Sequence, residues 1–258
     1  NKTALVTGST AGIGLGIAKR LADEGARVII NGRHSDNVMA TVENIIKETD
    51  NELVSGIAAD FSKKDEIENL IHKIPSLDIL INNVGIFNQV EFKDISDDQW
   101  LEIFDINVMS GIRLSRHYFP KMMEQNQGRI IFISSESALN IPTEMIHYGM
   151  SKTAQLSISR GLARLTRGSN VTVNAVLPGP TMSRANKNDL EKTAQEQSTS
   201  VESVINDFFK NRRPTSLSQR FADVDEVATM VAYIASPLSS STNGAALRVD
   251  GGVVNSII

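Results

Sequence analysis

The chain alternates short, β-branched apolar segments with longer segments whose apolar residues recur every three or four positions. This alternation predicts repeated strand–helix–strand units, in which consecutive strands run parallel. Several of the expected strands are almost wholly apolar, as strands covered by helices on both faces must be. The expected strands are Thr3–Thr7, Arg27–Asn31, Leu53–Ala58, Leu77–Asn82, Arg129–Ser134, Val171–Val176 and Ala245–Val249.

Between these strands, the apolar residues follow the 3.6-residue period of amphipathic helices. The expected helices are Ile13–Glu24, Asp36–Glu48, Lys64–Lys73, Asp97–Glu124, Tyr148–Arg167 and Asp223–Ala235. Parallel strands joined by right-handed helical crossovers form a doubly wound sheet. Because no linker or composition shift divides the sequence, we predict an α/β chain in which residues 1–258 form one Rossmann-type domain.

Composition excludes several classes of protein. With 41% apolar and 22% charged residues among 258, the chain is expected to fold and to bury a full core. It has no Cys, so disulfides, thiolate metal sites and Cys nucleophiles are excluded. Its four His residues lack metal-ligand spacing, and we predict no metal. The net charge of -4 disfavours a nucleic-acid partner, and no apolar run reaches the roughly 18 residues of a membrane span. The first residue is Asn1 and not Met, so the sequence leaves open whether a preceding targeting segment has been removed.

A glycine-rich turn, Gly8-Ser9-Thr10-Ala11-Gly12-Ile13-Gly14, joins the first expected strand to the first expected helix. Gly8 can form the tight turn, Gly12 lets a phosphate approach the backbone, and Gly14 lets the helix pack closely on the strand. The helix N-terminus then offers free N–H groups to a pyrophosphate. The pattern predicts a dinucleotide site, and a glycine turn kept only for packing is the alternative.

The end of the second expected strand indicates which dinucleotide is bound. A carboxylate at this position holds a ribose 2′-hydroxyl, whereas a 2′-phosphate requires a cation. Here Gly32 stands where the carboxylate is expected, and Arg33 follows. A guanidinium can bind a phosphate through two N–H groups, so the sequence favours NADP(H) over NAD(H). The alternative is that Arg33 is a solvated surface residue, and Ala11 supplies no second cation.

Tyr148 and Lys152 are four residues apart on an expected helix and therefore share one face. A phenol has a pKa of about 10, and a nearby ammonium lowers that pKa. Such a pair can exchange a proton with a carbonyl or alcohol oxygen. The Tyr–Lys spacing alone is common on protein surfaces, but Ser135 ends a strand thirteen residues before Tyr148. The three residues together predict a catalytic group.

With these residues in place, the sequence resembles the short-chain dehydrogenase/reductase family along essentially its whole length. The motifs that carry the resemblance are TGSTAGIG (Thr7–Gly14), NNVG (Asn82–Gly85), FDINV with Asn107, ISS ending at Ser135, YGMSK (Tyr148–Lys152), NAVLPGP (Asn174–Pro180) and VDGG (Val249–Gly252). The resemblance implies a nicotinamide cofactor, hydride transfer to or from a carbonyl carbon, a small-molecule carbonyl or alcohol substrate, and assembly as a homotetramer or homodimer. A cytoplasmic location is expected, without a membrane partner.

The resemblance also implies roles for individual residues. Tyr148 is similar to the family's general acid/base, and Lys152 to the residue that lowers its pKa and holds the nicotinamide ribose. Ser135 would stabilise the substrate oxygen, and Asn107 would hold a water in a proton relay. The residues expected to bind the cofactor are Gly8, Ser9, Thr10, Gly12, Ile13, Gly14, Arg33, Asp60, Phe61, Asn83, Gly85, Tyr148, Lys152, Pro178, Gly179 and Thr181. Val84 and Ser183 depart from the Ala and Thr that are usual in the family.

Residues 181–221 break the strand–helix alternation. They follow a Pro-Gly-Pro turn and have few apolar anchors among many Lys, Asn, Gln, Ser and Thr. Because this polar insertion follows the carboxyl end of a strand, we predict a substrate lid, with a plain surface excursion as the alternative.

Three neighbouring features are left with two interpretations each. Glu136 lines the substrate pocket or caps a turn, and His147 points into the cleft or to solvent. The basic run Lys210-Asn211-Arg212-Arg213 is expected to be a solvated face, with recognition of an acidic substrate group as the minor alternative.

Three functions are compatible with the sequence. The first is an NADP-dependent carbonyl reductase, and the second is an NAD-dependent alcohol or hydroxy-acid dehydrogenase of the same family. The third, from another class, is a scaffold that binds a dinucleotide without turnover. The presence of Asn107, Ser135, Tyr148 and Lys152 together counts against the scaffold.

Overall fold

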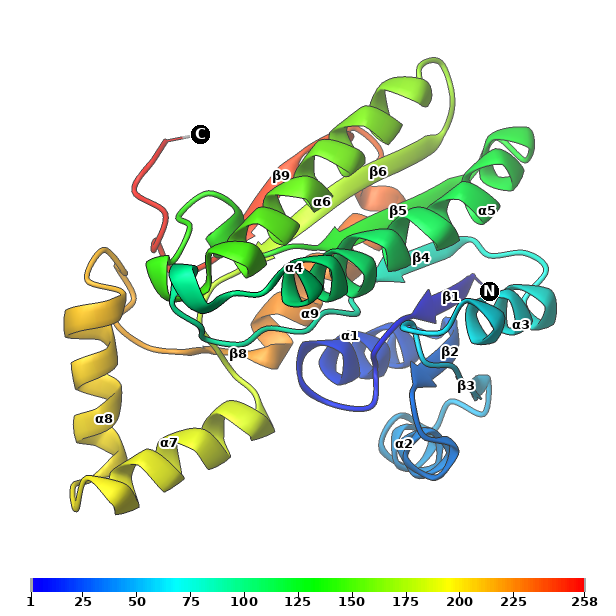
Figure 1. Ribbon diagram of the computed structural model, residues 1–258. Helices are drawn as coiled ribbons and strands as arrows, with labels where there is room; N and C mark the ends of the chain where they lie inside the picture. The colour runs from blue at the N-terminus through cyan, green and yellow to red at the C-terminus, as the bar shows by residue number, and fades with distance from the viewer. Residues whose placement is uncertain (1, 258) are drawn as a thin grey trace.

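The main sheet is parallel throughout and has the order β3-β2-β1-β4-β5-β6-β9 within residues 2–257, the part of the chain that the computed structural model describes (Figure 1). The strands are β1 (Thr3–Val6), β2 (Arg27–Gly32), β3 (Val54–Ala58), β4 (Ile79–Asn82), β5 (Gly128–Ile133), β6 (Val171–Pro178) and β9 (Ala246–Val249). The strand order reverses between β1 and β4, and ligands of doubly wound sheets bind at the carboxyl ends of the strands there. The predicted α/β Rossmann-type sheet is confirmed.

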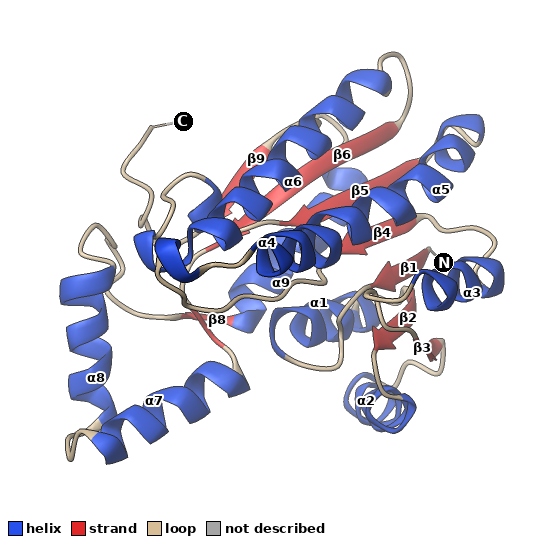
Figure 2. Cartoon of the chain, in the orientation of Figure 1, coloured by secondary structure: helices blue, strands red, loops and turns tan. Residues whose placement is uncertain are grey.

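Helices cover both faces of the sheet (Figure 2). One layer consists of α1 (Gly12–Asp23), α2 (Ser35–Thr49) and α9 (Val224–Ala235), and the other of α3 (Lys64–Lys73), α5 (Ser110–Glu124) and α6 (Ile146–Leu165). Ala4 and Val6 on β1 pack toward the first layer, and Leu5 toward the second, because side chains alternate along a strand. Each fully buried Leu or Ile contributes about 1.5–3 kcal/mol to this core.

The segment predicted as one helix, Asp97–Glu124, is interrupted. It consists of α4 (Asp97–Phe104), a π-helical turn (Asp105–Met109) and α5. The single-helix prediction is wrong because a π-turn preserves the helical pattern on either side of it and leaves little trace in the sequence. Such a turn removes some main-chain carbonyls from the regular α-helical ladder, and it carries Asn107.

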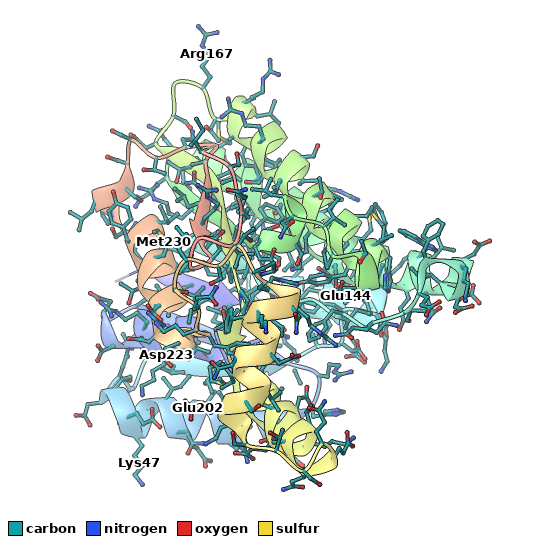
Figure 3. All side chains as sticks on the ribbon, turned by 90° about the vertical axis from the view of Figure 1, so that its left-hand side faces the viewer. Lys47, Glu144, Arg167, Glu202, Asp223 and Met230 are labelled. Atoms are coloured by element: carbon teal, nitrogen blue, oxygen red, sulfur yellow. The ribbon has the colours of Figure 1, made fainter. Side chains whose placement is uncertain are left out.

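Residues 181–221 form a helical arm that extends from the sheet (Figure 1). Strands β7 (Thr181–Met182) and β8 (Ala222–Asp223) pair in parallel at its base. The arm itself consists of α7 (Arg184–Glu196), α8 (Val201–Asp207) and a π-turn (Phe208–Arg212). Figure 3 views the molecule from the side of this α7–α8 arm, with Glu202 on α8 facing the reader. The segment predicted as a polar lid is therefore ordered and helical.

Short 3₁₀ turns connect several of these elements. They are Phe92–Asp94, Glu136–Ala138, Thr143–Met145 and Pro237–Ser239. Among residues 2–257, no helix combines the length and apolar character that crossing a membrane requires.

Candidate active site

The glycine turn joins β1 to α1 at the carboxyl edge of the sheet. Gly8 has a φ of +60° and Gly12 a φ of +57°, a backbone conformation that residues with a Cβ rarely adopt. A Cβ on Gly14 would lie 2.3 Å from the Gly8 carbonyl oxygen, so α1 can approach the turn only without a side chain there. The glycine spacing read from the sequence therefore meets three separate backbone requirements.

The first turn of α1 is available to an anion. Ala11 provides no side-chain cap, and the first turn contains no acidic residue. The first N–H groups of a helix lack partners within the helix and carry a partial positive charge. A Cβ on Gly12 would meet only the Ser183 Cβ, at 3.6 Å, so the backbone is open on that side. These residues fit the pyrophosphate of a dinucleotide.

Asn31, at the end of β2, braces this turn, a role that the sequence pattern did not indicate. Its Oδ1 accepts a hydrogen bond from the Gly8 N–H at 3.1 Å, and its own N–H donates to Ser9 Oγ at 2.9 Å. Ser9 and Asn31 are both buried. The Ser9 hydroxyl donates to the Val6 carbonyl oxygen at 2.7 Å, and the Ser9 N–H donates to the Asn31 carbonyl oxygen at 2.8 Å, so both donors of Ser9 are used within the fold.

Two residues of the NNVG motif lie on opposite sides of the site. Asn83 Nδ2 donates to the Thr7 and Gly8 carbonyl oxygens at 2.9 and 3.0 Å, which holds the glycine turn against β4. A Cβ on Gly85 would lie 3.3 Å from Lys152 Nζ. Gly85 thus brings its backbone close to the predicted catalytic ammonium.

Gly32, Arg33 and Asp60 lie at the rim where β2 and β3 end. A Cβ on Gly32 would lie 2.6 Å from Thr10 Cγ2, so a carboxylate cannot occupy this position without displacing Thr10. The Arg33 side chain is exposed. Hydrogen bonding from the Ser62 backbone N–H lowers the pKa of Asp60, and the Arg33 charge acts in the same direction. The rim therefore combines an exposed cation with an ionised carboxylate.

The other residues predicted to bind the cofactor differ in their surroundings. The Phe61 side chain is buried in the core beside α3 and does not face an open site. Ile13 is half-buried and packs against the core of the first layer. Thr181 Oγ1 donates to the Gly179 carbonyl oxygen at 2.9 Å, directly after Pro178 ends β6. Apart from Phe61, these positions border the carboxyl edge of the sheet.

Ser135, Tyr148 and Lys152 lie together at the carboxyl end of β5. Ser135 follows β5 directly, and the Ser137 N–H donates to its Oγ at 3.1 Å, which leaves the Ser135 hydroxyl proton free to donate. Tyr148 is half-buried in the first turn of α6, and the Lys152 Nζ lies 5.6 Å from its ring centre. Burial raises the pKa of Tyr148 to about 12, while its hydrogen bond with Ser135 acts in the opposite direction.

Lys152 is buried within the second layer. Its Nζ donates to the Ile133 carbonyl oxygen at 2.9 Å and to Gln155 Oε1 at 3.4 Å. Burial lowers the pKa of Lys152 to about 8. With this pKa, Lys152 is mostly an ammonium at neutral pH and loses its charge at mildly alkaline pH.

Asn107 uses its side chain to clamp the loop after β4. Its Oδ1 accepts from the Ile86 N–H at 2.7 Å, and its Nδ2 donates to the Ile86 carbonyl oxygen at 2.9 Å and to Ser151 Oγ at 3.0 Å. Its main-chain carbonyl accepts from Gln155 Nε2 at 2.6 Å. Gln155 was not predicted from the sequence as a site residue, although its position three residues after Lys152 places both on one helix face.

Glu136 and Arg213 form a buried ion pair beside Ser135, one of the predicted catalytic residues. Arg213 Nε donates to Glu136 Oε1 at 2.9 Å, and the two side chains are 10% and 3% exposed. Glu136 Oε2 has no hydrogen-bond partner among the described residues. Burial raises the pKa of Glu136, and the Arg213 charge opposes this rise. The prediction that Lys210–Arg213 is a solvated face is wrong for Arg213, because Glu136 attracts it into the fold.

His147 is fully buried, so the solvent-facing alternative is wrong for this residue. Its Nε2 lies 2.7 Å from Asn88 Oδ1, and the Trp100 ring packs edge-on against it at 5.8 Å. Burial lowers the pKa of His147. It therefore acts as a structural link between α6 and the loop after β4.

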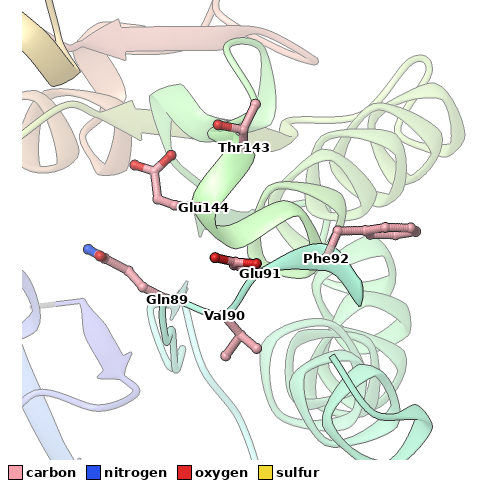
Figure 4. A pocket seen from close by; sticks show the side chains of 6 residues that line it. All are labelled: Gln89, Val90, Glu91, Phe92, Thr143 and Glu144. Atoms are coloured by element: carbon pink, nitrogen blue, oxygen red, sulfur yellow. The ribbon is translucent and has the colours of Figure 1, made fainter. Parts of the chain in front are cut away.

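Two shallow hollows lie where the loop after β4 meets the Thr143–Met145 turn. The first, of about 440 Å³, is lined by the six residues of Figure 4: Gln89, Val90, Glu91, Phe92, Thr143 and Glu144. The second, of about 450 Å³, shares Gln89, Thr143 and Glu144 with it and extends to Arg213. Phe87, two residues before Gln89, packs edge-on against Tyr148 with ring centres 5.9 Å apart. Tyr148 lines neither hollow, and the second hollow adjoins the end of the α7–α8 arm at Arg213.

Known proteins share these features. A family model described as short chain dehydrogenase matches residues 2–194. The oxidoreductase YvaG of Bacillus subtilis is 46% identical over 256 residues, which cover 99% of this chain and 97% of that protein. The D-β-hydroxybutyrate dehydrogenase of Cupriavidus necator is 34% identical over 98% of both chains. A solved structure of actinorhodin polyketide ketoreductase with NADPH superposes with a TM-score of 0.87 at 29% identity, covering 99% of this chain and 98% of that one.

The fold and the site therefore define an NAD(P)-dependent oxidoreductase that acts on CH–OH and C=O groups. The chain belongs to the short-chain dehydrogenase/reductase family, as its motifs indicated.

Proposed function

We propose that this protein is a carbonyl reductase that prefers NADP(H). The observation that carries the proposal is the convergence of Ser135, Tyr148 and Lys152 at the sheet edge that also holds the open N-terminus of α1. Arg33 is the exposed cation at the rim, and Gly32 supplies no carboxylate there. Both features favour a ribose 2′-phosphate over a free hydroxyl.

In the proposed reaction, the bound nicotinamide supplies a hydride to the carbonyl carbon. Ser135 donates a hydrogen bond to the carbonyl oxygen, and Tyr148 transfers its phenolic proton to that oxygen. The Lys152 ammonium stabilises the phenolate that remains on Tyr148 until solvent returns the proton. The second hollow, which extends to Arg213, is the proposed substrate entrance, and the α7–α8 arm, anchored by Arg213, is the proposed lid.

A second candidate is an NAD-dependent hydroxy-acid dehydrogenase. It is favoured by the 34% identity to the D-β-hydroxybutyrate dehydrogenase of Cupriavidus necator. A panel of ketones, aldehydes, alcohols and hydroxy acids, each tested with all four nicotinamide nucleotides, separates the two. Faster carbonyl reduction with NADPH supports the first proposal, and hydroxy-acid oxidation with NAD⁺ supports the second. Binding of NADPH without turnover of any compound would favour the scaffold.

We also propose assembly as a homotetramer or homodimer through the helices α4, α5 and α6. Leu101 on α4 and Leu165 on α6 are exposed apolar side chains, at 67% and 63%. Light scattering after size-exclusion chromatography gives the mass in solution, and a monomer of 28.1 kDa would reject the assembly.

A further inference from the structure

The buried Lys152 ammonium is held entirely by neutral groups. Within residues 2–257, no carboxylate lies within ion-pair distance of its Nζ, and Lys152 is only 4% exposed. Its two acceptors are the Ile133 carbonyl oxygen and Gln155 Oε1. A buried charge without a counter-ion depends on the dipoles directed at it, because it has lost its hydration.

Gln155 uses both ends of its amide. It is 2% exposed and lies one turn after Lys152 on the same face of α6. Its Oε1 accepts from the ammonium, and its Nε2 donates to the Asn107 carbonyl oxygen at 2.6 Å. That carbonyl is in the π-turn between α4 and α5, where the regular ladder is disturbed. The donor end is therefore committed to Asn107, which directs the acceptor end toward Lys152.

We propose that Gln155 is a positioning residue for the catalytic group: it holds the Lys152 ammonium near Tyr148 and ties it to the π-turn that carries Asn107. The proposal rests on the proposed function, in which Lys152 assists proton transfer by Tyr148. It assigns the amide a part in setting the charge state of Lys152, in addition to filling space between α6 and the π-turn.

Two substitutions have opposite consequences if the amide oxygen acts on the ammonium. Gln155→Met keeps the length of the side chain but removes the acceptor, so the charged form of Lys152 loses support and its pKa falls. Gln155→Glu places a carboxylate beside the ammonium, so the pKa rises. A hydrogen bond to a charged group contributes about 1.5–3 kcal/mol, which corresponds to a change of about one pH unit or more in the Lys152 midpoint. If Gln155 only fills space, the midpoint in Gln155→Met stays unchanged, so that variant decides between the two roles and Gln155→Glu shows only that this position acts on Lys152.

The first measurement does not require turnover. Protein isotope-labelled at the lysine Cε atoms is titrated by NMR, and the Lys152 signal is the one that Lys152→Arg removes. We expect the midpoint to move down in Gln155→Met and up in Gln155→Glu. Ser159→Ala is the matched control, because Ser159 is equally buried one turn further along α6 and has no hydrogen bond to Lys152. An unchanged midpoint in Gln155→Met would overturn the proposal.

The second measurement follows kcat/KM for carbonyl reduction against pH. The limb that falls with rising pH should move to lower pH in Gln155→Met and to higher pH in Gln155→Glu, with Ser159→Ala unchanged. Shifted NMR midpoints in a protein that turns over no substrate would retain the positioning role and reject the proposed function. Normal turnover with unshifted NMR midpoints would retain the proposed function and reject the positioning role. The thermal unfolding midpoint of each variant is measured as well. If the Gln155 substitutions lower only the unfolding midpoint and leave the Lys152 titration unchanged, the positioning role is rejected.

Discussion

Arg213 Nε lies 2.9 Å from Glu136 Oε1, although 77 positions separate the two residues in the chain. Arg213 follows the last turn of the α7–α8 arm, and Glu136 follows Ser135, a proposed catalytic residue. Both side chains are largely buried. This ion pair therefore attaches the proposed lid to the end of β5. Removal of Arg213 leaves the buried Glu136 carboxylate without its counter-ion, whereas removal of Glu136 leaves Arg213 with Glu144 Oε1 at 3.9 Å.

Arg213→Met should lower the free energy of unfolding at neutral pH by about 3 kcal/mol or somewhat more, because a buried carboxylate loses its counter-ion. The loss should shrink as the pH falls. Burial already raises the pKa of Glu136, and a protonated Glu136 needs no cation. Urea unfolding at a series of pH values measures both effects.

The double variant Glu136→Gln/Arg213→Met is the control for this ion pair. Without either charge, it should recover part of the lost stability at neutral pH. A double variant as unstable as, or less stable than, Arg213→Met would show that lost packing, and not the unpaired charge, causes the effect.

Tyr148→Phe should reduce kcat about 10²- to 10⁴-fold, the usual contribution of a positioned acid or base, and leave NADPH binding nearly unchanged. The phenol is lost, while the ring that packs against Phe87 is kept. Steady-state assays give kcat, and fluorescence titration gives the affinity for NADPH. Tyr233→Phe on α9, where the side chain is 46% exposed, is the matched control and should retain full activity. Substantial turnover by the Tyr148 variant would remove Tyr148 from its assigned role.

Arg33→Asp should weaken NADPH binding about 10- to 100-fold, because a charge-assisted hydrogen bond to the 2′-phosphate contributes about 1.5–3 kcal/mol. Binding of NADH should change much less. Calorimetry with both nucleotides measures the two affinities. Arg27→Asp is the control, since Arg27 is an exposed arginine at the opposite end of β2. Equal ratios of NADPH to NADH affinity in the parent and Arg33→Asp proteins would contradict the assigned preference.

The pH dependence of carbonyl reduction should follow Lys152. The reaction requires its ammonium, and the pKa of that group is about 8, lowered by burial. kcat/KM should therefore be level below this pKa and fall as the pH rises through it. The Tyr148 phenol, whose pKa is about 12, remains protonated over that range. A profile that stays level far above the Lys152 pKa would contradict the assignment.

The sequence alone was sufficient to predict the sheet and the positions of its local motifs. Alternation of apolar strands and amphipathic helices leaves few other ways to bury a core, and glycines at Gly8, Gly12 and Gly14 satisfy local backbone needs that can be read from spacing. Tyr148 and Lys152 share a face through helix geometry alone. These features depend on contacts within a few residues or on periodicity.

The tertiary structure decided what depends on contacts between distant segments. The π-turn at Asn107 leaves no periodic signal, so a single helix was expected there. The inward position of Arg213 depends on Glu136. The hydrogen bonds that link Lys152 through Gln155 to Asn107 also depend on the fold, because Gln155 and Asn107 are 48 positions apart in the sequence. A sequence shows which groups carry charge and hydrogen-bonding atoms, but burial and pairing fix their pKa values and orientation, and only the folded chain supplies both.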